Sequence, residues 1–227
     1  MHKNLLGGID DTVTDILYED KNFAAVIKKC GVLSQSASGS ENEESMVTLL
    51  SEQLRCPVYP VHRLDREAEG VMIYAKSKYA AGKLCDLVGR GGFEKQYLII
   101  VHGAPSENSG TYEDLLFKDS KKNKSYVVDR ERKGVKKAVL NYELIKNGEI
   151  DGNAVSLIRV KLVTGRTHQI RVQFSSRGMP VLGDSRYGSR YKCDMCLFSE
   201  RIAFVSPFDG KEYVFEAESE NEVFKMI

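Results

Sequence analysis

Apolar residues recur at helical spacing twice in the N-terminal half of the chain. Over residues 46–54, Met and Leu stand three or four positions apart, and Ser40 with the Glu three residues after it has capping-box spacing. A second stripe covers residues 80–88, after Ser77 and before a group of glycines. The pattern predicts one helix from about Glu41 and another that begins near Ser77.

Other segments have the patterns of β-strands. Residues 70–75 and 97–101 are short apolar or β-branched runs, whereas apolar and polar residues alternate over 138–144 and 158–162. Near the C-terminus, residues 202–215 contain two apolar stretches around an Asp-Gly pair, which predicts a hairpin with a tight turn. The sequence therefore predicts an α+β fold with mainly antiparallel strands.

The chain has the composition of a globular protein. It contains 227 residues, of which 42% are hydrophobic, and its 33 Lys and Arg nearly balance its 32 Asp and Glu, for a net charge of +1. A core can form without disulfides or metal, and no repeat, linker or compositional break divides the sequence. We therefore expect a single domain over residues 1–227. Near-neutrality argues against a nucleic-acid partner, since such proteins usually carry a basic excess.

Charge is nevertheless unevenly distributed. From Lys118 to Lys137 the chain has nine Lys or Arg and three acidic residues, a local excess of six. A solvated loop and a contact to RNA phosphates both explain such a segment, and charge alone favours the loop. Acidic runs at 41–44 and 216–222 offset this excess in the total.

The five cysteines are odd in number and scattered, which fits a reducing compartment better than a disulfide framework, so we expect a cytoplasmic protein. The first residues lack the long apolar stretch of a signal peptide, and apolar runs such as 98–101 are too short to span a membrane. Cys193 and Cys196 have the spacing of half a zinc site, but neither a second pair nor a His completes it. We expect no metal and no membrane partner.

The first candidate site is the segment Val61–Asp65, Val-His-Arg-Leu-Asp, which leads into the predicted strand at 70–75. A carboxylate flanked by His and Arg on a loop before a strand is a candidate nucleophile or general base. In the structural alternative, Asp65 caps a turn and Arg63 pairs with it. A protein-kinase interpretation fails, because no glycine-rich loop or Asp-Phe-Gly accompanies this segment.

The second candidate lies in residues 162–171, Leu-Val-Thr-Gly-Arg-Thr-His-Gln-Ile-Arg. A strand ends here, Gly165 permits a sharp turn, and a helix is expected from about Thr167. Arg166 then stands beside a helix N-terminus, a corner that suits a phosphate or a partner carboxylate. A capped helix with exposed Arg and His is the structural alternative. The third candidate, Tyr97 in a predicted strand, is by itself best explained as a core residue.

Together these segments resemble the RluA-type pseudouridine synthases, in which a His-Arg-Leu-Asp motif, a Lys-x-Tyr strand and a Thr-Gly-Arg-Thr-His-Gln-Ile-Arg motif follow in this order. The resemblance runs from about Thr12 to about Ala217 and includes a Gly-Asp-x-x-Tyr-Gly loop at 183–188. The chain departs from the family at residues 29–31, where Lys-Pro-x-Gly is usual, and at 68–70, where Thr-Ser-Gly is common. We expect no S4 RNA-binding module.

The resemblance implies a pseudouridine synthase fold: a long mixed, mainly antiparallel sheet flanked by helices and loops, with a central catalytic cleft. It implies an isomerase that converts uridines of ribosomal or transfer RNA to pseudouridine and needs neither cofactor nor metal. Asp65 is then the nucleophile or general base, Arg166 its ion-pair partner, and Tyr97 the residue that packs on the uracil and accepts the C5 proton. Arg63 is the wedge that replaces the flipped-out nucleotide in its stack. The residues implied in substrate or RNA binding are His62, Arg63, Lys95, Thr167, His168 and Arg171. We expect a monomer whose partner is RNA.

Two other functions compete with this interpretation. A non-catalytic RNA-binding protein or chaperone on the same scaffold would keep the basic segment and lose Asp65, Tyr97 or Arg166, whereas all three are present. A hydrolase that uses Asp65 and His62 would need a second catalytic carboxylate, which we do not recognise, and it leaves the motif at 164–171 unexplained.

Overall fold

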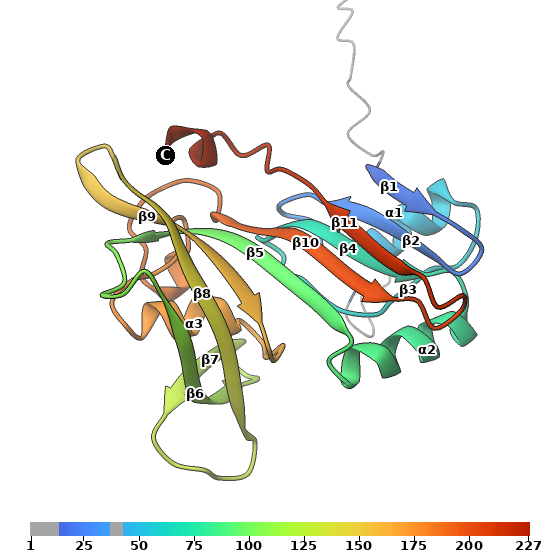
Figure 1. Ribbon diagram of the computed structural model, residues 1–227, viewed down its shortest axis with the longest axis horizontal. Helices are drawn as coiled ribbons and strands as arrows, with labels where there is room; N and C mark the ends of the chain where they lie inside the picture. The colour runs from blue at the N-terminus through green and yellow to red at the C-terminus, as the bar shows by residue number, and fades with distance from the viewer. Residues whose placement is uncertain (1–13, 37–42) are drawn as a thin grey trace, which may run out of the picture.

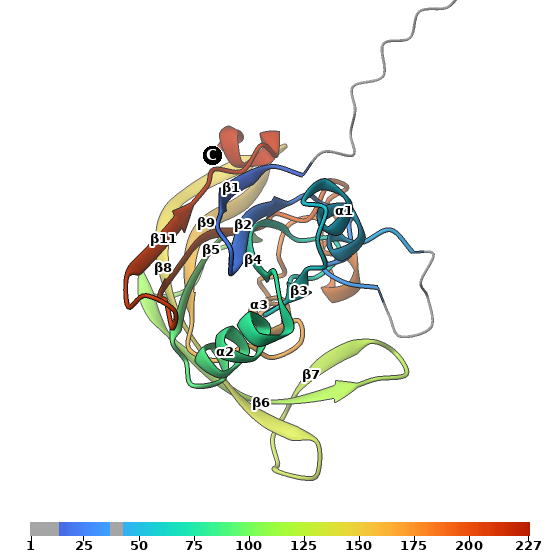
Figure 2. The ribbon, with the colours of Figure 1, turned by 90° about the vertical axis from the view of Figure 1, so that its right-hand side faces the viewer.

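The computed structural model describes residues 14–36 and 43–227, and its strands form one eleven-stranded sheet. The strands follow the order β1-β2-β4-β10-β5-β9-β8-β6-β7, with β11 paired to β10 and β3 to β4. Figure 1 shows β10 and β5 running through the middle of the molecule, with α2 beside one part of the sheet and α3 beside the other. The sheet is strongly bent, as the end-on view in Figure 2 shows.

The elements have the following bounds. The strands are β1 (Ile16–Glu19), β2 (Phe23–Lys28), β3 (Tyr59–Pro60), β4 (Glu69–Ala75), β5 (Phe93–His102), β6 (Ser109–Asp119), β7 (Lys124–Val128), β8 (Val135–Ile150), β9 (Asn153–Leu162), β10 (Leu197–Val205) and β11 (Glu212–Glu216). The helices are α1 (Met46–Gln53), α2 (Lys78–Gly89), α3 (Gln169–Ser175) and the 3₁₀ turns η1 (Ser185–Tyr187) and η2 (Glu222–Met226).

The predicted fold class is confirmed. Among the strand pairs of the described residues only β4 with β10 is parallel, and the others are antiparallel, including the predicted hairpin of β10 and β11. The strands expected at 70–75, 97–101, 138–144 and 158–162 lie within β4, β5, β8 and β9. None of the helices formed by the described residues is long and apolar enough to cross a membrane.

The helix starts are partly as predicted. Ser77 caps α2 by accepting a hydrogen bond from the backbone N–H of Ala80. The first helix does not begin near Glu41: its cap is Ser45, whose side chain accepts from the backbone of Thr48 while the Thr48 hydroxyl accepts from the backbone of Ser45. The expected cap Ser40 lies outside the described residues. This capping box uses Thr in place of Glu, so the Ser-x-x-Glu spacing placed the helix start too early.

The basic segment 118–137 is not a solvated loop. It contains the end of β6, the whole of β7 and the start of β8, with Leu115 paired to Val128 and Phe117 to Tyr126. The sequence shows no clear alternation of apolar and polar residues here, because few positions of these strands are buried. Within β6 and β7, only Leu116 and Ser125 are less than a tenth exposed. We call residues 118–137 the basic hairpin. It projects from the sheet on the side opposite the C-terminus (Figure 1).

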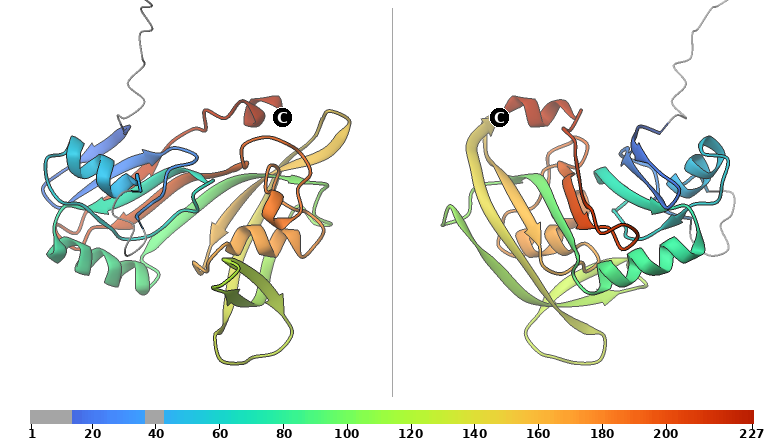
Figure 3. Two further views of the ribbon diagram at one scale, coloured as in Figure 1. Left: turned by 180° about the vertical axis from the view of Figure 1, so that it is seen from behind. Right: turned by 45° about the vertical axis from the view of Figure 1, so that its right-hand side comes forward.

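Strands β2 and β4 are packed on both faces of the sheet, which explains why they are mostly apolar. Alternate residues of β2 and β4 enter two separate core clusters, with Val26 and Met72 on one face and Phe23 and Ile73 on the other. A strand buried on both faces is apolar throughout, which is why 70–75 shows no alternation. Seen from behind in Figure 3, α3 packs against β6 and β7. Helix α2 packs instead against β3 and β4, so the two helices lie beside different parts of the sheet.

Gly70 lies where β4 pairs with β10, and replacing it tests how closely these two strands approach each other. Its backbone φ is +119°, and a Cβ there would lie 2.4 Å from the carbonyl oxygen of Ser199. We expect Gly70→Ala to lower the free energy of unfolding by about 2–4 kcal/mol in urea titrations. Gly82→Ala, at an exposed interior position of α2 with nothing within 4 Å, should instead raise it by about 0.5–1 kcal/mol. Equal effects of the two changes would contradict this contact.

Candidate active site

A cleft of about 690 Å³ brings the three candidate segments together. Its walls come from the loop 61–65, the C-terminal end of α2, strand β5, the turn 163–168 and the start of α3. All nine predicted site residues line it: His62, Arg63, Asp65, Lys95, Tyr97, Arg166, Thr167, His168 and Arg171. The expected central cleft is therefore present, although Asp65 and Arg171, for example, lie 106 residues apart along the chain.

The residue before Asp65 anchors the loop in the core. Leu64 is 8% exposed, and the Ser34 hydroxyl donates to its carbonyl oxygen at 2.9 Å and accepts from its backbone N–H at 3.1 Å. Ser34 is itself buried and belongs to the segment after β2. The backbone on the N-terminal side of Asp65 is thereby held in one place, while the Asp65 side chain remains 24% exposed to the cleft.

A buried lysine holds the C-terminal side of the same loop. Lys28, at the end of β2, has no exposed surface, and its ammonium donates to the carbonyl oxygens of Arg66 at 3.0 Å and Ala68 at 2.7 Å. Burial lowers the pKa of Lys28 to about 8, because the charged form loses its hydration. Three carbonyl contacts offset part of that loss, the third being to Lys29. The loop that carries Asp65 is thus braced from both sides.

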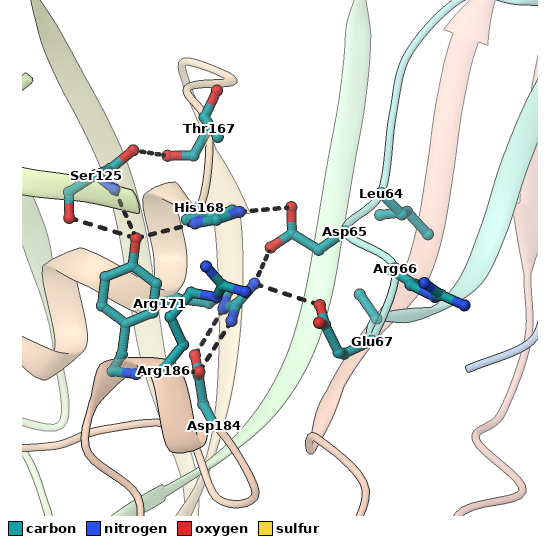
Figure 4. A network of polar contacts seen from close by, with 12 residues as sticks. Leu64, Asp65, Arg66, Glu67, Ser125, Thr167, His168, Arg171, Asp184 and Arg186 are labelled. Carbon is teal, nitrogen blue, oxygen red and sulfur yellow. Dashed lines mark hydrogen bonds and ion pairs between the residues drawn. The ribbon is translucent and has the colours of Figure 1, made fainter. Parts of the chain in front are cut away.

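Arg171 joins Asp65 to a second carboxylate. Its Nη1 donates to Asp65 Oδ2 at 2.7 Å, and its Nε and Nη2 donate to the two oxygens of Asp184 at 2.6 and 2.9 Å (Figure 4). The side chains of Arg171 and Asp184 are 3% and 1% exposed. Burial by itself would lower the pKa of Arg171, but the hydrogen bonds and charges of Asp184 and Asp65 outweigh burial and raise it. Arg171 is a permanently charged partner that orients the Asp65 carboxylate.

The predicted ion pair between Asp65 and Arg166 is wrong. Arg166 is exposed, and its Nε donates to the carbonyl oxygen of Lys137 at 2.9 Å. Arg166 lies in the exposed turn before α3, whereas Arg171 lies within the buried helix, and its Nη1 donates to Asp65. Arg171, which we had expected to bind RNA, therefore takes the place predicted for Arg166.

A buried glutamine closes the turn around Arg166. The Gln169 Oε1 accepts from the Thr164 hydroxyl at 2.8 Å and from the backbone N–H of Arg166 at 3.0 Å, and its Nε2 donates to Val139 in β8 at 3.1 Å. Helix α3 begins at Gln169, two residues after the expected start, and His168 at its cap has a left-handed φ of 53°. Thr164 and Gln169 of the motif at 164–171 thus shape this corner.

Tyr97 and Lys95 project from the same face of β5 into the cleft, two residues apart. Tyr97 is 5% exposed, and burial together with the Asp65 charge raises the pKa of its phenol, which therefore stays neutral. Burial lowers the pKa of Lys95, which forms no salt bridge with any described residue. Tyr97 is a core residue, as its place in a strand predicts, and it also lines the cleft. Its catalytic role stays a prediction.

His62 and Arg63 occupy different levels of the cleft. The His62 Nε2 accepts from the backbone N–H of Ile73 at 3.1 Å, and its buried Nδ1 has no hydrogen-bond partner in the described chain. Burial, with the nearby charge of Lys95, lowers the pKa of His62 to about 3, so the ring is neutral. Arg63 is exposed at the rim and pairs with no described carboxylate, which removes the Arg63–Asp65 turn alternative.

Sequence reasoning missed several residues that hold this site. Asp184 lies in the Gly-Asp-x-x-Tyr-Gly loop, a motif that could have identified it, because a buried carboxylate requires a cationic partner. Ser34, Lys28 and Gln169 carry no comparable signal. No group of three or more His, Cys, Asp or Glu suited to a metal occurs within residues 14–36 and 43–227. At Cys196, burial raises the pKa of the thiol, which is therefore protonated.

Comparison with known proteins supports the resemblance. A family model described as RNA pseudouridylate synthase matches residues 22–176. The chain is 33% identical over 232 residues to an "Uncharacterized RNA pseudouridine synthase" of Aquifex aeolicus, covering 94% of this chain and 71% of the relative. It is 30% identical over 211 residues to "Ribosomal large subunit pseudouridine synthase C" of Rickettsia bellii, covering 91% and 68%.

Solved structures show the same fold. "Human RNA Pseudouridylate Synthase Domain Containing 1" superimposes with a TM-score of 0.77 at 23% identity, covering 92% of this chain and 84% of that one. "Human RNA Pseudouridylate Synthase Domain Containing 4" gives 0.72 at 21% identity, covering 90% and 88%. The architecture is therefore a pseudouridine synthase fold.

The two arginines differ in burial and partners, which predicts different effects on stability. Arg171→Met leaves Asp184 buried without a cation and should lower the free energy of unfolding by about 3–5 kcal/mol. Arg166→Met removes one exposed contact to a carbonyl and should change it by less than about 0.5 kcal/mol. Urea titration of both variants at pH 7 provides the measurement. A larger loss for Arg166→Met would show that the ion-pair assignment is reversed.

Proposed function

The chain belongs to the RNA pseudouridylate synthases, a family of isomerases, and on that premise we propose that it converts uridine to pseudouridine in ribosomal or transfer RNA. The reaction breaks the bond between N1 and C1′, rotates the uracil and joins C5 to C1′. The observation that carries the proposal is Asp65, an accessible carboxylate held by buried Arg171 at 2.7 Å in a cleft that Tyr97 also lines.

Asp65 supplies the reactive group in this proposal. A nucleophile or general base must be ionised and correctly oriented, and Arg171 provides both a neighbouring positive charge and a directed hydrogen bond. The Tyr97 ring offers a flat, neutral surface for the uracil. The cleft volume lies within the ~300–1,000 Å³ typical of small-ligand sites, which suits one extruded nucleotide.

Cations without carboxylate partners support an RNA substrate. Arg63, Lys95 and Arg166 line the cleft, and none of them forms a salt bridge with a described carboxylate. Charged side chains left unpaired around a cleft favour an anionic ligand. In this proposal the exposed Arg63 stacks where the flipped nucleotide leaves. The Rickettsia relative is named for the large ribosomal subunit, which puts ribosomal RNA first among the substrates to test.

The Asp65 carboxylate is tested by Asp65→Asn, which preserves shape and removes the charge. We expect pseudouridine formation in RNA from cells that lack the gene to fall by about 10³-fold or more, with RNA affinity little changed. Asp151→Asn, at the turn between β8 and β9, is the matched control and should retain activity. Full turnover by Asp65→Asn would contradict the proposed chemistry, and release of free uracil by the wild-type protein would indicate a hydrolase.

The basic hairpin is expected to contact RNA phosphates. Replacing the exposed Lys121, Lys122 and Lys133 with Ala should weaken RNA binding and reduce the salt dependence of log K by about 0.7–0.9 for each lost contact. Lys146→Ala with Lys211→Ala changes exposed lysines outside the hairpin and serves as control. Fluorescence anisotropy over a series of salt concentrations measures both sets. An unchanged slope in the hairpin variant would show that RNA does not reach this surface.

A further inference from the structure

A line of polar contacts runs from the basic hairpin to Asp65. The backbone N–H of Ser125, in β7, donates to the Tyr187 hydroxyl at 2.8 Å, and that hydroxyl lies 2.9 Å from Nδ1 of His168. The other ring nitrogen of His168, Nε2, faces Oδ1 of Asp65 at 3.7 Å (Figure 4). Arg171 holds the opposite carboxylate oxygen, Oδ2. Each oxygen of Asp65 therefore has its own facing group.

The hydrogen bonds determine where the His168 proton resides. The Tyr187 hydroxyl accepts from Ser125, so its single proton is available to Nδ1 of His168 at 2.9 Å or to the Ser125 carbonyl at the longer 3.3 Å. Donation to the nearer atom makes Nδ1 an acceptor and leaves the proton of a neutral ring on Nε2, toward Asp65.

The surroundings of His168 keep its ring neutral. Burial lowers the pKa of His168; Asp65 and Asp184 oppose this shift, and the charges of Arg171 and Arg186 add to it. A neutral imidazole with Nδ1 accepting from a hydroxyl can donate only through Nε2. The ring is therefore a directed donor and not a second cation beside Arg171.

The backbone of His168 has an unusual conformation that determines where its side chain points. His168 has a φ of 53°, in the left-handed region, and its side chain is only 7% exposed. Non-glycine residues seldom adopt this conformation. The His168 side chain forms no capping hydrogen bond that would account for it. Here the conformation turns the imidazole inward, between Tyr187 and Asp65.

We propose that His168 is a positioning residue for Asp65, kept in its Nε2–H tautomer by the Tyr187 hydroxyl. The inference rests on the proposed function, in which Asp65 reacts. His168 and Arg171 together define the plane of the carboxylate, and a 3.7 Å separation is of the kind that shortens when a ligand fills a site.

The tautomer is measured directly by ¹⁵N-resolved NMR of the imidazoles in the RNA-free protein. The chain has four histidines, and the structure assigns opposite tautomers to two of them: Nε2–H for His168 and Nδ1–H for His62, whose Nε2 accepts from a backbone N–H. We expect Tyr187→Phe to abolish the preference at His168 and leave that at His62 intact. A wild-type His168 in the Nδ1–H form would overturn the proposal whether or not the protein proves to be a pseudouridine synthase.

Measurements of kcat and KM distinguish a positioning role of the Tyr187–His168 contact from a purely structural one. Tyr187→Phe keeps the ring that packs on Arg171 and loses only the hydroxyl, so we expect kcat to fall about 10-fold with KM unchanged. Tyr191→Phe also removes a hydroxyl bonded to another side chain, but away from the cleft, and should match the wild type. An unchanged kcat in Tyr187→Phe would contradict the role.

Two variants of His168 complete the test. His168→Gln retains an amide donor of similar reach and should keep more of kcat than His168→Leu, which retains none. Equal losses in the two variants would mean that His168 acts only through packing. If the wild-type protein forms no pseudouridine, the proposed function fails, and the tautomer measurement still decides how His168 is placed.

Discussion

The arrangement of the site depends on one buried cation between two carboxylates. Arg171 donates to Asp65 and, in a two-bond contact, to Asp184, and almost none of its side chain is exposed. A buried guanidinium is tolerated only where its hydrogen bonds are satisfied and its charge is balanced. Helix α3, the loop at 183–188 and the loop at 61–68 must therefore meet at one point. That requirement brings two distant halves of the sheet to the same cleft.

The sheet makes this meeting rigid. Strands β2 and β4 are covered on both faces, so the loop between β3 and β4 starts from a fixed support, and Ser34 and Lys28 hold it on either side of Asp65. On the other side, Gln169 locks the turn before α3 to β8. The proposed chemistry would then use side chains whose backbone is held by several contacts, which is the condition for precise orientation of a carboxylate.

The charged residues are unevenly distributed over the molecule. The net charge of +1 hides a basic hairpin and a cleft lined by unpaired cations, balanced by acidic residues elsewhere. Total charge therefore says little about an RNA partner, whereas local placement says much. The hairpin is also a structural part of the site, because its Ser125 anchors Tyr187, and Tyr187 contacts His168 beside Asp65.

The sequence by itself determined several local elements and part of the lining of the cleft. Ser77 and the apolar stripe after it specify α2, and three short motifs named all nine predicted lining residues, because caps, periodicity and motif identity are short-range properties. Only the tertiary structure decided that Arg171 and not Arg166 pairs with Asp65, and that Tyr187 stands behind His168. The physical reason is that Arg166 lies in an exposed turn, whereas Arg171 lies in a buried helix facing the loop that presents Asp65, 106 residues away along the chain. The spacing of residues along the chain does not encode this tertiary contact.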